Sequence, residues 1–157
     1  MLFVKNARLL VKCGTRLMQA RGYANEMKLT FAAANRTFYD NADVLQIDVP
    51  SFSGSFGILA NHVPTLAALK PGVVQVIEND GKIIKYFVSS GTVTVNEDSS
   101  VQVLAEEAHE IKDIDISEAR LLLSKYQSIM SSSSSDVAKA EAAVAVECCE
   151  ALIKAAE

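Results

Sequence analysis

The side chains best suited to chemistry in this sequence are its two histidines, which stand far apart in the chain. His62 lies between Asn61 and Val63 in a stretch rich in glycine and proline, where it could serve as a general base. A histidine in such a turn more often makes hydrogen bonds that fix the turn, and we favour that role. His109 has acidic neighbours, which suits a solvated junction. With no Walker-type loop and no connected Ser, His and acid grouping, the sequence predicts no catalytic site.

Besides the histidines, the side chains that could react are those of the cysteines and of one lysine. Cys148 and Cys149 are adjacent in a segment of helical periodicity, so a disulfide between them would be strained, and we expect reduced thiols that pack as small hydrophobes. Neither histidine has a further Cys or His at ligand spacing, so no metal site and no cofactor are predicted. Lys82 follows Asp80 and Gly81 and could be a lipoyl-type attachment lysine. An exposed turn lysine is the simpler interpretation.

The elements that would position these residues begin with strands, from Met27 to about Ile111. Valines alternate with polar residues, as at Val93 and Val95, and this period of two predicts strands in packed sheets. Three polar clusters predict hairpin turns, at 79–81, 89–91 and 97–100. Short strands with turns at this spacing predict an all-β sandwich of about ten short strands.

At Asp115 the period changes to that of a helix. Asp115 and Glu118 can form a capping box, and apolar residues then recur at three- and four-residue spacing to Met130. The serines at 131–135 should end this helix and form a linker, with Asp136 as the N-cap of a second, alanine-rich helix. The larger apolar residues of that helix are Val137, Val144, Cys148 and Leu152. We expect an antiparallel two-helix hairpin after the sandwich, an α+β chain overall.

The stretch from Gly54 to Val76 is the most specific pattern in the chain. Its glycines and prolines predict a tight, rigid loop around short apolar runs. The order of nine residues here resembles the signature of the small central-stalk subunits of rotary F-type ATP synthases, called delta in mitochondria and epsilon in bacteria. These residues are Gly54, Gly57, Ile58, Leu59, His62, Pro64, Leu69, Pro71 and Gly72. The likeness continues in domain order to the C-terminus.

The resemblance implies a function in binding. Such a subunit clasps the rotating gamma subunit and stands on the ring of membrane c subunits, so that proton flow is coupled to ATP synthesis. It implies a non-catalytic, peripheral subunit on the matrix side of the mitochondrial inner membrane, with the small mitochondrial epsilon subunit as a further candidate partner. In the family the loop matching Ser55 to His62 faces the ring. The candidate contacts are therefore Ser55, Phe56, Gly57, Ile58, Leu59, Asn61 and His62.

The candidate contacts are not all expected to be equally exposed. Phe56, between Ser55 and Gly57, is expected to be the most exposed apolar contact. Ile58 and Leu59 could belong to the core instead, and the sequence leaves both interpretations open.

The first 23 residues predict a mitochondrial presequence. Residues 1–23 contain five basic residues and no acidic one, with apolar residues along one helical face, and Arg21 precedes a processing-type site near Ala24. Cys13 would leave with this segment. Since the whole chain carries −4, the remainder carries −9, which argues against nucleic acid as a partner. The expected division is 1–23 presequence, 24–112 sandwich and 113–157 helical hairpin.

A nucleotide motif of some bacterial relatives is broken here. Their first helix begins with Ile or Leu, then Asp, two variable residues, Arg and Ala, whereas this chain has Glu118 at the arginine position. A carboxylate there would repel phosphate, so we expect no ATP binding and no bacterial-style extension of the hairpin into the catalytic head.

Two other functions fit the sequence less well. An unrelated matrix carrier or scaffold module of sandwich type would carry a covalent adduct on Lys82, and a small hydrolase would depend on His62.

Overall fold

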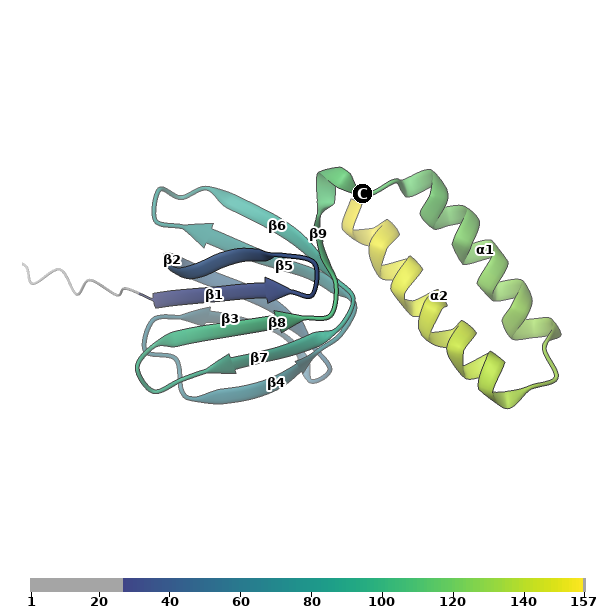
Figure 1. Ribbon diagram of the computed structural model, residues 1–157, viewed down its shortest axis with the longest axis horizontal. Coiled ribbons are helices and arrows are strands. Elements are labelled where there is room, and N and C mark those ends of the chain that lie inside the picture. Colours follow the sequence, from purple (N-terminus) through teal and green to yellow (C-terminus); the bar gives the residue numbers. More distant parts are fainter. Residues whose placement is uncertain (1–26, 157) are drawn as a thin grey trace, which may run out of the picture.

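The computed structural model describes residues 27–156, so the predicted presequence lies outside the described residues. Nine strands come first, and two helices follow them (Figure 1). The strands are β1 Met27–Ala33, β2 Thr37–Ser51, β3 Gly54–Leu59, β4 Thr65–Leu69, β5 Gly72–Glu78, β6 Ile83–Val88, β7 Gly91–Val95, β8 Ser100–Ala105 and β9 Ala108–Glu110. A single 3-10 turn, η1 Ile111–Asp113, leads to α1 Ile116–Ser132 and α2 Asp136–Ala156. The predicted sandwich with a following helical pair is confirmed.

The long strand β2 joins the two layers of the sandwich. Its first part pairs with β1, and its second part pairs with β3 and β5. One layer contains β1, β8, β7 and β4, and the other contains β3, β2, β5, β6 and β9. The pairing of β1 with β8 is parallel, while the other strand pairs are antiparallel.

The core lies between the layers and is built from the inward side chains of alternating positions. Its largest fully buried members include Phe31, Met27, Leu29, Ile47 and Ile58. An aromatic cluster closes one side, where the Phe31 ring stacks on Phe38 at 4.9 Å and meets Tyr86 edge-on at 5.3 Å. Close packing of this kind makes the layers move as one body.

Two of the three predicted hairpin turns are confirmed. Residues 79–81 join the antiparallel pair β5 and β6, and residues 97–100 lead from β7 into its partner β8. The prediction at 89–91 is wrong, because β6 and β7 lie in different layers and this turn carries the chain across the sandwich. Alternation within a strand does not reveal which strand lies beside it.

The helical pair differs from the prediction at its connection. The first helix runs on to Ser132, and the hydroxyls of Ser131 and Ser132 donate to the Ser128 carbonyl instead of ending the helix. Asp115 is the N-cap as predicted, accepting from the backbone of Ser117 and Glu118. The second helix is capped by Ser135 and not by Asp136. The Ser135 carbonyl accepts from the Lys139 N–H, and its hydroxyl accepts from Ala138.

The residues that α2 buries are not the larger apolar residues named from the sequence. Ala142 and Cys149 are its buried residues, whereas Val137 and Val144 are exposed. Small residues at the contact let the two helices lie close together, and α2 lies between α1 and the sandwich (Figure 1). Cys148 and Cys149, the cysteines within the described residues, are free thiols, and burial raises the pKa of each.

Candidate interface along strand β3

The stretch predicted as a tight loop is an edge strand. Residues Gly54–Leu59 form β3, which pairs antiparallel with the end of β2 from Ser51 to Gln46. Only Gly54, with φ of +121°, takes the left-handed conformation that favours glycine, at the turn that enters the strand. The buried Ser51 hydroxyl fixes that turn by donating to the Gly54 carbonyl at 2.7 Å.

The second glycine of the motif is required by a neighbouring side chain. A Cβ at Gly57 would lie 2.7 Å from Oδ1 of Asp48 on the adjacent strand. That oxygen already accepts a hydrogen bond of 2.6 Å from the Gln46 amide. The absence of a side chain at Gly57 therefore leaves room for the Gln46–Asp48 pair on the outer face of the sheet.

The alternation along β3 separates the predicted contacts into two faces. Ile58 points inward and is 0% exposed, so it belongs to the core and leaves the set of candidate contacts. Phe56 lies on the same inward face, half-buried against the core, which corrects the expectation that it is the most exposed residue. Leu59 points outward and is 56% exposed. The exposed positions of the strand are thus Gly54, Ser55, Gly57 and Leu59, of which the last three belong to the predicted contacts.

The turn after β3 holds the two polar candidates. Asn61 has φ of +61°, and its backbone N–H donates to the Ser99 hydroxyl at 3.0 Å, which ties this turn to the one between β7 and β8. The Nδ1–H of His62 donates to the Val63 carbonyl at 2.8 Å, and its ring lies 6.1 Å from that of Phe56. His62 is therefore the turn-fixing residue that the sequence favours over a catalytic base.

A groove of about 420 Å³ separates β3 from β4. The two strands diverge, because β4 pairs with β7 along its length but with β2 only at Leu69. Both strands present backbone edges to the groove. Its walls are Ser53, Gly54, Ser55, Phe56, His62, Thr65, Leu66 and Ala67. None of these carries a carboxylate or an amine, so the groove is suited to a surface of low charge.

Exposed apolar side chains gather around the turn between β3 and β4. Leu59, Val63 and Leu66 are 56%, 69% and 75% exposed. Nothing in the sequence marks Val63 and Leu66 as surface residues, because an apolar run such as Leu66 to Leu69 is equally typical of a core strand. The pairing of β4 with β7 is what turns Leu66 outward. A cluster of this kind on a folded protein marks a contact surface.

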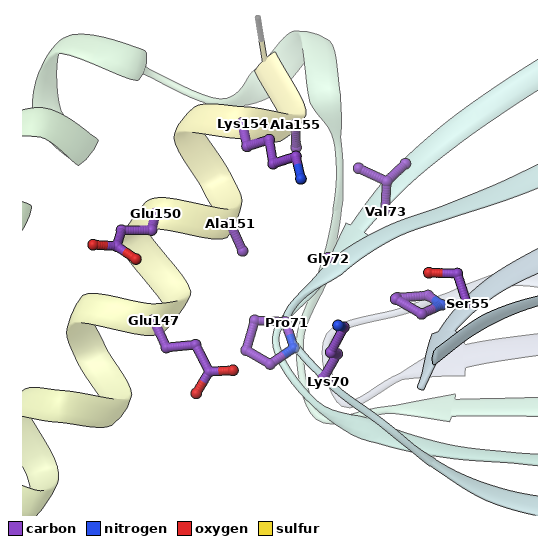
Figure 2. A pocket seen from close by; sticks show the side chains of 11 residues that line it. Ser55, Lys70, Pro71, Gly72, Val73, Glu147, Glu150, Ala151, Lys154 and Ala155 are labelled. Carbon is purple, nitrogen blue, oxygen red and sulfur yellow. The ribbon is translucent and has the colours of Figure 1, made fainter. Parts of the chain in front are cut away.

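A second hollow lies between the sandwich and α2 (Figure 2). It measures about 560 Å³ and lies between the β4–β5 turn at Pro71 and Gly72 and the last turns of α2. In Figure 2 Lys154 reaches toward the sandwich, and the Glu147 carboxylate points toward Pro71. The hollow shows that α2, and not α1, is the helix that meets the sandwich.

Side chains that could ligate a metal are not grouped in the described part of the chain. Residues 27–156 contain no group of three or more His, Cys, Asp or Glu side chains placed to hold a metal ion. His109 lies on β9 and His62 in the turn after β3, so the two histidines belong to separate elements. Within the same residues, neither helix has the length and apolar character needed to span a bilayer.

Comparison with known proteins gives consistent matches over most of the chain. Residues 26–111 match the family model for the ATP synthase, Delta/Epsilon chain, beta-sandwich domain. The mitochondrial ATP synthase subunit delta of Caenorhabditis elegans is 49% identical over 146 residues, covering 87% of this chain and 89% of that protein. The subunit of the same name from Saccharomyces cerevisiae is 40% identical, with 85% and 82% covered.

Two solved structures share the fold. A chain in the Euglena gracilis mitochondrial ATP synthase structure, of OSCP/F1/c-ring, superposes with a TM-score of 0.79 at 25% identity and covers 85% of this chain and 82% of its own length. A chain in the Tetrahymena thermophila central stalk/c-ring structure gives 0.61 at 15% identity, with 84% and 97% covered.

Proposed function

The chain belongs to the delta/epsilon family of ATP synthase subunits, and from that membership we propose that it is a non-catalytic central-stalk subunit of the mitochondrial enzyme. Its partners are the gamma subunit and the membrane c-ring, which it joins so that proton flow drives ATP synthesis. It works on the matrix side of the inner membrane, attached through the complex. The small mitochondrial epsilon subunit is a further proposed partner.

The observation that supports a rotor role is that a rigid two-layer sandwich bears an exposed apolar turn between β3 and β4. Torque transmission requires that the subunit resists deformation, and two layers joined through β2 with one buried core must deform together. The Leu59, Val63 and Leu66 side chains stand outside this body, beside an uncharged groove. A stiff domain with a low-charge apolar contact suits a rotor coupling better than it suits an enzyme.

We propose that the ring-facing contact is formed by the exposed part of the predicted set. It contains the exposed residues Ser55, Gly57, Leu59 and Asn61 and the half-buried His62, whose ring lies beside that of Phe56 on the inward face. Leu59 supplies the apolar contact, and the Asn61 and His62 side chains lie in the turn whose backbone is already fixed. The carrier and hydrolase alternatives are not supported by the family membership.

Replacement of Leu59 tests this proposal. Leu59→Asp should leave the sandwich folded, since the side chain is largely exposed, but should weaken assembly onto the ring by about 2 to 5 kcal/mol, because the new charge must be desolvated at the interface. The measurement is recovery of the chain with gamma and the c-ring from membranes, together with ATP-driven proton pumping.

A matched control is Val137→Asp. Val137 is 69% exposed in the first turn of α2, where an acidic residue suits the helix end. It should change neither melting nor coupling. Unchanged assembly and pumping in the Leu59 variant would refute the contact surface, and absence of the wild-type chain from the purified synthase would refute the function itself.

A further inference from the structure

The outer edge of β6 is only partly covered. Strand β9 pairs with Tyr86, Phe87 and Val88, the second half of β6, and the chain then turns away as η1. The first half, Ile83–Lys85, pairs with β5 on one side and has no described strand on the other. Figure 1 shows β6 at the margin of the sandwich, with β9 beside one end of it. An unpaired strand edge is a template for another extended chain.

A hollow of about 500 Å³ lies against this free edge, between β6 and η1. Its apolar walls are three isoleucines, Ile83, Ile84 and Ile111. Ile83 is 55% exposed on the outer face, while Ile84 packs against the core from the inner face. A strand added here would therefore find an isoleucine on each face of the sheet.

The charges around the hollow are mostly positive. Lys82, Lys85 and Lys112 line it together with Glu110. The Glu110 carboxylate is engaged by Lys112 at 2.6 Å and by Arg36 at 3.3 Å. Asp80 accepts from the backbone N–H of Lys82 and not from its amine.

Lys82 and Lys85 therefore remain available to a partner. Neither forms a salt bridge within residues 27–156. The placement is unusual for this protein, since acidic residues outnumber basic ones by 19 to 15 in the chain. Two unengaged lysines beside an open strand edge favour a negatively charged occupant.

We propose that this edge of β6 docks an extended acidic segment of another ATP synthase subunit, which adds to the sheet as a short strand beside Ile83–Lys85. Successive residues of a strand face opposite sides, so Lys85 lies on the outer face with Ile83, while Lys82 lies just before the strand begins. The segment therefore carries a carboxylate toward Lys85 on its outer face and another toward Lys82 at its end, and its inner face carries apolar residues that cover Ile84 and Ile111. Residues 1–23 of this chain cannot be that segment, because they contain no acidic residue. The inference rests on the proposed place of the chain in the synthase.

Hydrogen–deuterium exchange of segment 82–86 tests the inference, in the purified synthase and in the isolated full chain. The amides that point away from β5 should exchange about tenfold more slowly in the complex. The double variant Lys82→Glu with Lys85→Glu should lose this protection. The matched control, Lys125→Glu with Lys139→Glu, makes the same charge change at exposed positions of the helices and should keep it.

Zero-length carbodiimide crosslinking identifies the occupant. Mass spectrometry should find Lys82 or Lys85 joined to Asp or Glu of one segment in another subunit. Equal exchange of 82–86 in the complex and the isolated chain, with gamma and the c-ring recovered, would overturn this inference and leave the proposed function standing. Protection that survives the charge reversal would overturn the acidic occupant. A chain that does not co-purify with the synthase would overturn both proposals.

Discussion

Two neighbouring residues in β3 should respond to mutation in opposite ways. Ile58 is fully buried, so Ile58→Ala should lower the free energy of unfolding by about 2 to 5 kcal/mol through lost burial and a cavity. Leu59→Ala should change it by no more than about 0.5 kcal/mol, because Leu59 faces out. Urea titration of the purified chain measures both values. Equal losses would mean that the alternation along β3 is not as described.

Because inward and outward residues alternate along β3, a charged substitution at Phe56 cannot test the ring contact alone. Phe56 packs against the core from the inward face of β3. Phe56→Asp would therefore weaken the fold as well as any contact with the ring, so a loss of coupling would be ambiguous. Leu59 is the better probe of the interface, because its side chain can change without disturbing the core.

The carboxyl group of Glu110 should have a lower pKa than an ordinary glutamate. The hydrogen bond from Lys112, with a smaller contribution from Arg36, lowers the pKa of Glu110. Because the pKa is lowered in the folded chain, the ionised Glu110 stabilises the fold at pH values above the ordinary glutamate pKa. This stabilisation is lost as the pH falls through the lowered pKa. Carboxyl-carbon NMR across the acidic range measures the pKa. Lys112→Met should raise it, while Lys125→Met should leave it unchanged.

Among the elements, the first helix depends on its N-cap. Asp115 accepts from the Ser117 N–H at 2.8 Å and from the Glu118 N–H at 3.3 Å. Asp115→Ala should lower the free energy of unfolding by about 1 kcal/mol, because these amides lose their partner. Asp136→Ala should cost less, since Asp136 lies inside the first turn of α2 and its effect is limited to the helix dipole. Denaturant titration distinguishes them, and a larger loss at Asp136 would contradict the Ser135 cap.

The serine run shows why an element boundary can escape sequence analysis. Serine is favoured in linkers, but its hydroxyl can also donate to a carbonyl of the preceding turn within a helix. Ser131 and Ser132 do this, so α1 continues two residues into the run. The helix ends at its C-cap Ser133, whose N–H donates to the Ile129 carbonyl, and the run of identical serines does not mark that position.

For the whole molecule, the chain isolated from mitochondria should begin within a residue or two of Ala24. The segment before it contains five basic residues and no acidic one, as matrix presequences do. The mature chain would then carry −9 in place of −4. Intact-mass measurement of the endogenous protein checks both the start and the charge, and retention of Met1 would contradict the presequence.

The sequence alone determined the order of sandwich and helices, the cap at Asp115 and the family signature. These depend on local signals, such as period two, period 3.6, capping residues and a fixed order of glycines and prolines. The tertiary structure decided that β3 is an edge strand, that Ile58 is core while Leu66 is exposed, and that β6 and β7 lie in different layers. Such features depend on pairing between distant strands, and a shift of one residue in that pairing would turn every side chain to the other face.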